Sequence, residues 1–218
     1  MGQTILTDQQ RIVLELFANE VSLRNVFYLS GGTALSEFYL QHRDSEDLDF
    51  FTDEAVDTIL VQKFIQKITK HFGIQSARIE HIHDRRLFFL NINENELKIE
   101  FTSYPFLQLE KHIKQKGIFV DSLRDITANK LAALIDRFEP KDFVDLYFIL
   151  QNRSLQDVKS DTEKKFGLSI SPLFLGGELA KVRRIEILPR MRVPLSLDEL
   201  KTFFTKLARE LKPEILNF

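Results

Sequence analysis

The stretch from Phe27 to Phe51 constrains the fold of this chain more than any other, because two strands and a helix follow one another around a pair of glycines. A short apolar strand over residues 26–29 leads into Ser30-Gly31-Gly32-Thr33, and an amphipathic helix is predicted over residues 34–41. Adjacent glycines let backbone N–H groups face an anion, and the N-terminus of a following helix adds about half a positive charge. The turn is therefore a candidate phosphate site, and a simple tight turn is the alternative.

A pair of aspartates, Asp47 and Asp49, ends the same stretch. In an extended segment both carboxylates point to one face, while Leu48 and Phe50 point to the other. Two carboxylates one pleat apart suit a hard divalent cation, Mg²⁺ or Mn²⁺, although such a pair alone also fits a solvated strand edge. Combined with the glycine turn, the pair forms the arrangement that metal-dependent phosphoryl transfer requires.

Composition limits the kind of protein and its chemistry. The 218 residues suffice for one ordinary domain or two small ones, and 44% hydrophobic with 28% charged residues is typical of a folded soluble protein. The absence of cysteine excludes disulfides, cysteine-based zinc sites and thiol nucleophiles. No segment resembles a signal peptide or approaches the roughly 20 apolar residues of a membrane helix. We expect a cytoplasmic protein with no membrane partner.

Charge is distributed unevenly along the chain. The net charge is −2, but residues 151–218 hold 13 Lys and Arg against 9 Asp and Glu, a balance of +4 that leaves −6 for residues 1–150. A basic cluster in this region indicates a surface for a polyanion, and a solvated basic face is the alternative. Its members are Lys181, Arg183, Arg184, Arg190 and Arg192.

The N-terminal part is predicted to combine helices with strands. Thr7 and Gln10 form a candidate capping box, and Thr52-Asp53-Glu54 has the chemistry of a helix start. The expected elements are helices over residues 8–20 and 56–72, an antiparallel meander of strands over 77–83, 87–93 and 96–104 with turns at 84–85 and 94–95, and a short strand over 117–120.

Glu100 lies in the last strand of the predicted meander. Strand alternation puts Glu100 on one face together with Glu96 and Lys98, while Leu97, Ile99 and Phe101 face the other way. Glu100 is thus a candidate third carboxylate beside the aspartate pair, and an ordinary solvated strand position is the alternative.

The C-terminal part is predicted to be helical. Lys130 lies in a helix over residues 125–138 among small alanines, and Asp142 and Asp145 share one face of the next helix, which begins near Lys141. An acidic first turn also fits simple complementation of the helix dipole. Further helices are expected over residues 155–166, 173–183 and 197–211. We therefore expect two domains, over residues 1–120 and 121–218, with a cleft between them that faces the glycine turn and the aspartate pair.

Arg43 lies on the turn just before the aspartate pair. Its guanidinium suits contact with a phosphate or orientation of a carboxylate. A structural salt bridge with Asp44 or Glu46 is the alternative.

Three segments resemble the AbiEii/AbiGii toxin-type nucleotidyltransferases, a family within the DNA polymerase β-like nucleotidyltransferase superfamily. They are Gly31-Gly32-Thr33-Ala34-Leu35, His42-Arg43-x-Ser45-x-Asp47-Leu48-Asp49-Phe50-Phe51, and the run from Asp125 to Tyr147 that contains Lys130, Arg137, Asp142 and Asp145. The resemblance covers about residues 27–150, and its three-part order is more specific than any single part.

The resemblance implies an α+β fold, in which a nucleotidyltransferase-like mixed β-sheet with flanking helices is followed by a helical C-terminal half. It also implies roles for individual residues. The triphosphate would be held at Ser30, Gly31, Gly32, Thr33, Arg43 and Lys130, the metal at Asp47, Asp49 and Glu100, and the catalytic set would be Asp47, Asp49, Lys130 and Asp142. Lys141 departs from the family, where arginine commonly precedes this aspartate, because lysine lacks the bidentate geometry of a guanidinium.

The expected reaction is Mg²⁺-dependent transfer of a nucleoside monophosphate from an NTP to an acceptor hydroxyl, with pyrophosphate as the leaving group. The resemblance points to a toxin or phage-defence component with RNA, such as the tRNA 3′ end, as acceptor and a cognate antitoxin as partner. A small-molecule acceptor is one alternative. A non-catalytic nucleotide-binding or protein-interaction module of the same fold is another.

Overall fold

The computed structural model describes residues 4–75, 77–92 and 95–211, and the chain divides into two compact units. The first, here called the sheet unit, is drawn from Met1–Gln41, Ser45–Phe106 and Glu110–Ser122. The second, the helical unit, is drawn from His42–Asp44, Leu107–Leu109 and Leu123–Phe218. The described residues include no helix that is both long and apolar enough to cross a membrane.

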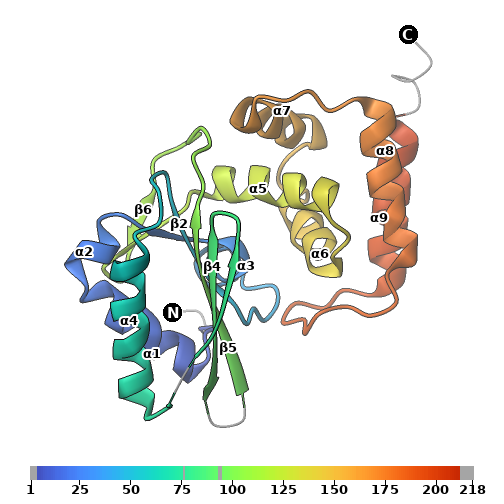
Figure 1. Cartoon of the computed structure of the whole chain (residues 1–218). Coiled ribbons are helices and arrows are strands. Elements are labelled where there is room, and N and C mark those ends of the chain that lie inside the picture. The colour runs from blue at the N-terminus through green and yellow to red at the C-terminus, as the bar shows by residue number, and fades with distance from the viewer. Residues whose placement is uncertain (1–3, 76, 93–94, 212–218) are drawn as a thin grey trace. The chain divides into compact units, whose positions relative to one another are not determined.

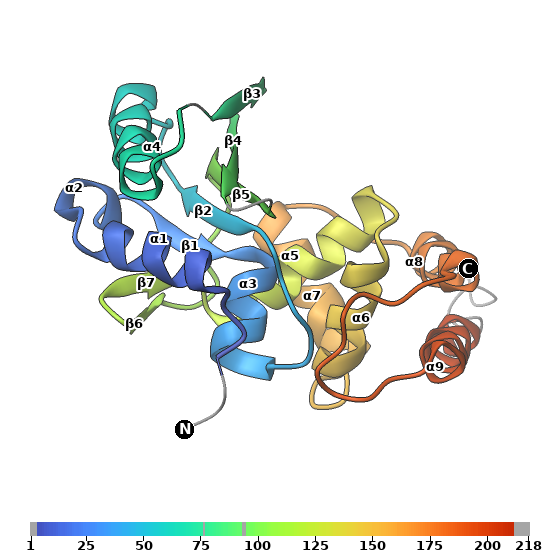
Figure 2. The ribbon, with the colours of Figure 1, turned by 90° about the horizontal axis from the view of Figure 1, so that it is seen from below.

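The sheet unit is built on one mixed seven-stranded sheet with the strand order β3-β4-β5-β2-β1-β7-β6 (Figures 1 and 2). β2 lies at its centre, antiparallel to β1 and parallel to β5. The strands are β1 Tyr28–Ser30, β2 Leu48–Thr52, β3 Arg78–Ile82, β4 Arg85–Ile92, β5 Asn95–Ser103, β6 Ile113–Gln115 and β7 Ile118–Val120. The predicted meander is present as β3, β4 and β5, although the predicted turn at residues 94–95 extends outside the described residues.

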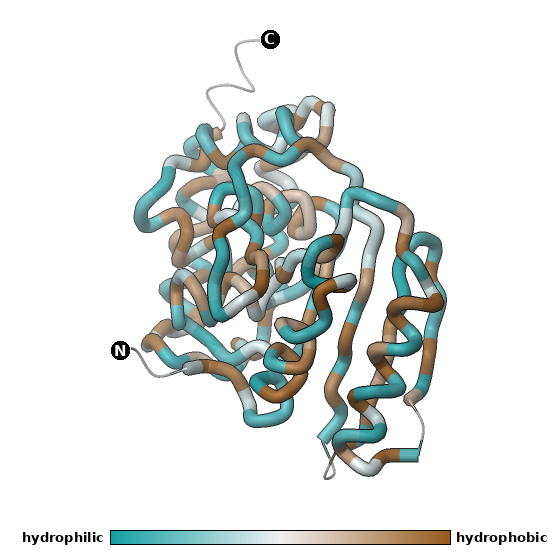
Figure 3. Tube along the Cα trace, turned by 90° about the vertical axis from the view of Figure 1, so that its left-hand side faces the viewer, coloured by the Kyte–Doolittle hydropathy of each residue, from teal (hydrophilic) through white to brown (hydrophobic). Residues whose placement is uncertain are grey.

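Aromatic side chains fill the core between the sheet and two helices, α1 (Asp8–Ala18) and α4 (Thr58–Phe72). The ring of Phe17 on α1 stacks on that of Phe50 at a centroid distance of 4.3 Å, and Phe101 lies 5.1 Å from Phe50 on the neighbouring strand. Hydrophobic and hydrophilic residues alternate along the trace, as expected for elements that bury one face (Figure 3).

Helix boundaries in the sheet unit follow local capping chemistry. α1 has the predicted capping box of Thr7 and Gln10. α4 begins after Asp57, whose carboxylate caps its first turn, and ends at Gly73 in a left-handed conformation. The predicted helix start at Thr52-Asp53-Glu54 is wrong, because Thr52 completes β2 and pairs with Ser103 of β5.

Two short elements follow β1. The predicted helix over residues 34–41 begins three residues earlier, as α3 (Gly31–Leu35), and widens into a π-helical turn, η1 (Ser36–Leu40), which ends at left-handed Gln41. α2 (Val21–Arg24) precedes β1. The prediction also missed β6, which forms a hairpin with β7.

The helical unit contains the predicted series of helices. These are α5 Leu123–Asp136, α6 Pro140–Ile149, α7 Leu155–Phe166, α8 Pro172–Ala180 with the 3₁₀ turn η2 Lys181–Arg184, and α9 Leu197–Glu210. The bounds of α7 agree with the prediction because Ser154 caps its start and left-handed Gly167 ends it. α8 and α9 run side by side (Figure 1).

Glu37 attaches the start of the chain to the sheet unit. Its buried carboxylate accepts hydrogen bonds from Thr4, from the backbone N–H of Ile5 at 2.9 Å and from Lys116 Nζ at 2.7 Å. Burial alone would raise the pKa of Glu37, but these donors outweigh it and hold the pKa below its ordinary value of 4.5. The carboxylate is therefore a charged acceptor that holds three separate segments together.

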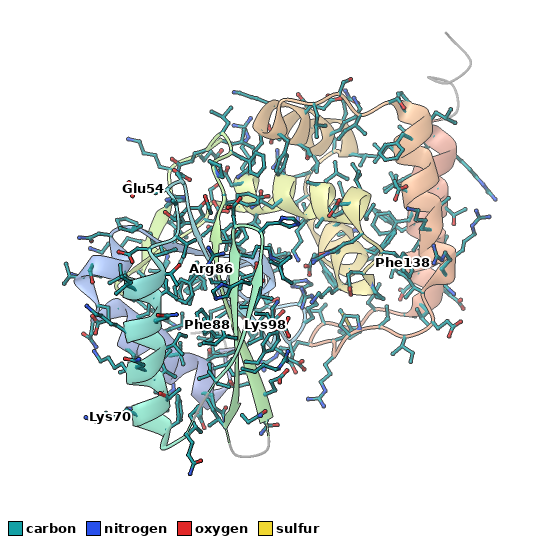
Figure 4. The ribbon with its side chains drawn as sticks, viewed as in Figure 1. Glu54, Lys70, Arg86, Phe88, Lys98 and Phe138 are labelled. Carbon is teal, nitrogen blue, oxygen red and sulfur yellow. The ribbon has the colours of Figure 1, made fainter. Side chains whose placement is uncertain are left out.

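We expect Glu37→Gln to lower the free energy of unfolding by about 1–3 kcal/mol at about pH 7, because the charged acceptor is lost. Since the folded pKa is depressed, the contribution of Glu37 is present above about pH 4.5 and is lost as the pH falls through the folded pKa, so the difference from the wild type shrinks in acid. Urea unfolding at several pH values measures it. Glu54→Gln, at an exposed loop position (Figure 4), is the control. An equal loss at every pH would contradict the assignment.

Candidate active site

One face of the central strands in the sheet unit is polar. Asp49 on β2 is paired with Ser30 on β1 and with Glu100 on β5, and paired residues project to the same side of a sheet. Leu48 and Phe50 point to the opposite side and are fully buried in the core. The predicted alternation of acidic and apolar residues in β2 agrees with the structure, and this side of the sheet is called the polar face below.

The glycine turn lies directly against the aspartate pair. Gly31 has φ +71°, and a Cβ atom added to it would lie 2.1 Å from Oδ2 of Asp49. Thr33 donates a hydrogen bond to the backbone carbonyl of Asp47, which ties α3 to the approach to β2. The glycine turn and the aspartate pair, which lie some 16 residues apart in the sequence, are thus in contact. Only glycine fits at position 31, because any larger side chain would overlap Asp49.

Ser30 is fully buried beneath the turn and is held by Asp121. Its hydroxyl donates to Oδ2 of Asp121 at 2.8 Å, and the backbone carbonyl of Asp121 accepts from the hydroxyl of Tyr39 at 2.7 Å. Asp121, which the sequence did not single out, follows β7, and β7 runs parallel to β1. The signal that was available is its position just after a predicted strand, where parallel strands present their carboxyl ends together.

Glu100 is part of a dense ionic group on the polar face. Its Oε1 accepts from Arg85 Nε at 2.6 Å and from the Thr102 hydroxyl at 2.7 Å, and its Oε2 accepts from Arg85 Nη2 at 2.8 Å. Lys98 Nζ lies 3.4 Å from Oε2 of Glu100 and 3.2 Å from Oδ2 of Asp47. Arg85 and Lys98 were not predicted as site residues, although the alternation of β5 had placed Lys98 beside Glu100.

These contacts fix the charge of both partners. Burial alone would raise the pKa of Glu100, but Arg85, Thr102 and Lys98 together hold it below 4.5. Burial lowers the pKa of Lys98, and the carboxylates of Asp49, Asp47 and Glu100 more than compensate and raise it above 10.5. A carboxylate and an ammonium group therefore face each other on the polar face at neutral pH.

Asp47 and Asp49 fit a hard divalent cation. Both side chains offer carboxylate oxygens as metal ligands. The side chain of Asp47 is about 29% exposed, so a metal ion can reach it from solvent. Mg²⁺ is commonly bound by one or two carboxylates and completes its shell with water and phosphate oxygens. Within residues 4–75, 77–92 and 95–211, no group of three or more His, Cys, Asp or Glu is placed to hold a metal ion.

In the helical unit, the other residues of the family pattern form a buried ionic cluster around Asp145. Lys130 Nζ lies 2.6 Å from Asp145 and 3.0 Å from Asp142. Arg43 binds Asp145 in a bidentate manner at 2.6 and 2.8 Å, and His42 Nε2 lies 2.8 Å from the same carboxylate. Arg43 therefore forms a salt bridge, with a partner 102 residues away in place of the predicted Asp44 or Glu46.

Charge balance keeps Lys130 and Asp145 ionised. Burial lowers the pKa of Lys130, but Asp145 and Asp142 outweigh both burial and the repulsion of Arg43, and the pKa is raised. Burial alone would raise the pKa of Asp145, and Lys130, Arg43 and His42 hold it well below 3.8. Lys130 and Asp142 are thus paired with each other inside the helical unit, whereas the aspartate pair belongs to the sheet unit.

The predicted basic cluster is partly engaged in local contacts. Lys181 pairs with Glu178, Arg192 pairs with Asp44 at 2.5 Å, and the guanidinium of Arg184 lies 4.7 Å from the centre of the Phe138 ring. Arg183 and Arg190 are exposed. The cluster therefore keeps positive charge at the surface although some of its members are paired.

Comparison with known proteins gives a consistent family match. A family model described as the nucleotidyl transferase AbiEii toxin of type IV toxin–antitoxin systems matches residues 14–214. An uncharacterised protein of Aquifex aeolicus is 31% identical over 167 residues, which cover 74% of this chain and 76% of that protein.

Solved structures share the fold at low sequence identity. A crystal structure of a nucleotidyltransferase candidate from Helicobacter pylori has a TM-score of 0.60 at 18% identity, covering 97% of this chain and 98% of that one. MenT4, a nucleotidyltransferase toxin of Mycobacterium tuberculosis, has a TM-score of 0.55 at 14% identity, covering 97% and 86%. These likenesses confirm the predicted α+β class, with its mixed sheet and flanking helices.

We expect Gly31→Ala to disrupt the polar face, because the new methyl group meets the carboxylate of Asp49 in addition to straining the backbone. Gly73→Ala is the matched control, since Gly73 has φ +67° but nothing lies within 4 Å of an added Cβ. Thermal unfolding should show a cost of about 1 kcal/mol for Gly73→Ala and a clearly larger one for Gly31→Ala. Equal costs would show that the contact with Asp49 is unimportant.

Proposed function

Because the chain belongs to the AbiEii family of nucleotidyltransferase toxins, we propose that it transfers a nucleoside monophosphate from an NTP to an acceptor hydroxyl and releases pyrophosphate. The observation that carries the proposal is the contact between the glycine turn and Asp49, beside Asp47. A phosphate-binding turn and a metal-binding carboxylate pair must lie side by side for this reaction, because the triphosphate contacts both.

Asp47 and Asp49 would hold the divalent cation, Mg²⁺ or Mn²⁺, and the backbone at Gly31, Gly32 and Thr33 would hold the triphosphate. The bound cation supplies positive charge near the α-phosphate and the leaving pyrophosphate. Gly31 keeps the turn close to Asp49, since a larger residue would push the two apart. The buried hydrogen bond from Ser30 to Asp121 holds the glycine turn in place. Fixed positioning of reacting groups lowers the activation free energy of a transfer reaction substantially.

Lys130 and Asp142 are proposed as catalytic residues on the family pattern alone. Lys130 would neutralise the charge of the phosphates. Asp142 would orient the side chain of Lys130, and the distance of 3.0 Å between the two groups supports this role. Arg43 would act through Asp145. Asp142 is the proposed acceptor for the proton of the attacking hydroxyl.

The catalytic proposal predicts that Asp49→Asn lowers NTP-dependent transfer by at least about 10³-fold, because the neutral amide binds a divalent cation poorly. Pyrophosphate release from labelled NTP in the presence of Mg²⁺ measures the loss, and circular dichroism confirms that the variant is folded. Asp53→Asn, at an exposed position just after β2, is the control and should keep wild-type activity. Unchanged transfer by Asp49→Asn would refute the proposed site.

We propose RNA as the acceptor, with the tRNA 3′ end as the candidate, and a cognate antitoxin as a partner in the cytoplasm. The family is described as part of type IV toxin–antitoxin systems. The exposed basic side chains of Arg183 and Arg184 supply positive charge for an RNA backbone.

Incubation with each of the four labelled NTPs and total RNA should label RNA, and the double variant Arg183→Glu, Arg184→Glu should reduce the labelling at least about tenfold, more at low than at high salt. The double variant Lys63→Glu, Lys70→Glu changes the charge by the same amount at two exposed positions of α4 (Figure 4 labels Lys70) and is the control. Pyrophosphate release without RNA labelling would favour a small-molecule acceptor. Tight NTP binding without pyrophosphate release would instead indicate a nucleotide sensor.

A further inference from the structure

We propose that the ammonium group of Lys98 takes the place of a second metal ion on the polar face, so that the sheet unit binds one divalent cation, at Asp47 and Asp49. Glu100 then holds Lys98 and Arg85 in position and does not coordinate the metal. The inference rests on the proposed function and assigns the roles of two further residues within it. Lys98 lies on β5, which pairs with β4 (Figure 4).

The oxygens of Glu100 are fully engaged by protein donors. An ionised carboxylate has about four lone-pair sites. Three of these accept hydrogen bonds of 2.6–2.8 Å from Arg85 and Thr102, and the fourth faces the ammonium group of Lys98 at 3.4 Å. A metal ion would have to displace one of these donors to reach Glu100. The bidentate arginine is the strongest of these contacts and makes that displacement costly.

Lys98 occupies the position beside Asp47 where a second cation would have to bind. Its ammonium nitrogen lies between the carboxylates of Asp47 and Glu100, at 3.2 and 3.4 Å. Lys98 lies two residues before Glu100 on β5. Because β5 runs parallel to β2 and Glu100 is paired with Asp49, Lys98 lies level with the segment that leads into β2. Its side chain is only 23% exposed, so this position is held by the fold.

The charge in the immediate surroundings of Lys98 favours a single divalent cation. In this group, Asp47, Asp49 and Glu100 carry three negative charges, and Lys98 and Arg85 carry two positive ones, which leaves −1. One divalent cation changes this balance to +1, and a second would bring it to +3 without a free carboxylate to bind it. In enzymes with two metals, the two ions lie about 3.5–4 Å apart. Lys98 therefore stands in for the charge of the second ion.

Titration of the full-length protein with Mn²⁺, in the absence of nucleotide, tests the inference. The wild type should bind one Mn²⁺ per chain. Lys98→Met should bind it about tenfold more tightly, because a single charge about 6 Å from a divalent ion in water repels it by roughly that factor. Lys98→Arg keeps the charge and should bind like the wild type. Thermal unfolding confirms that the variants are folded.

Several outcomes would overturn the inference. If Lys98 has only a structural role, Lys98→Met lowers the melting temperature without tightening Mn²⁺ binding. If Glu100 is a ligand, Glu100→Gln abolishes binding, or the wild type binds two ions. Failure of the proposed function is distinguishable, because the wild type would then bind no Mn²⁺ or Asp49→Asn would bind it normally.

Discussion

The pairing of β2 with two different neighbours is the constraint on which the site depends. β1 lies antiparallel on one side and β5 parallel on the other, so Asp49 is flanked by Ser30 and Glu100 at the same height in the sheet. A shift of one residue in either pairing would turn the acidic side chains into the aromatic core and expose the apolar ones. The stack of Phe17, Phe50 and Phe101 opposes such a shift, because all three rings are fully buried. The core thus fixes the register of the strands, and the register fixes the chemistry of the polar face.

The helical unit depends on a different interaction, the ionic cluster around Asp145. Removal of one partner from a buried ion pair leaves an unpaired charge and typically costs about 3–5 kcal/mol. Asp145 has two such partners, Arg43 and Lys130, which come from distant parts of the sequence, and it also forms a hydrogen bond with His42. The family pattern that joins residues 42–51 to residues 125–147 is therefore also a pattern of residues that the fold requires. Residues with a strong structural role and residues with a proposed catalytic role share the same segments of this chain.

The sequence predicted the local features well because their causes are local. Strand alternation predicted the side of Asp49, and the predicted bounds of α7 agree with the structure because local residues, Ser154 and Gly167, cap the helix. The partners of the site residues were not predictable, because they come from distant segments. Ser30 binds Asp121, 91 residues later, and Arg43 binds Asp145, 102 residues later. The false helix start at Thr52 shows the same limit, since pairing with Ser103 overrides its capping chemistry.

We propose that Asp47 and Asp49 together form the metal-binding pair of a nucleotidyltransferase. Anomalous diffraction from crystals grown with MnCl₂ and a non-hydrolysable NTP analogue tests this proposal. We expect a manganese peak bonded to carboxylate oxygens of both aspartates, with phosphate oxygens of the analogue completing the shell and the analogue against Gly31. A manganese peak that contacts neither aspartate, with the analogue bound elsewhere, would contradict it.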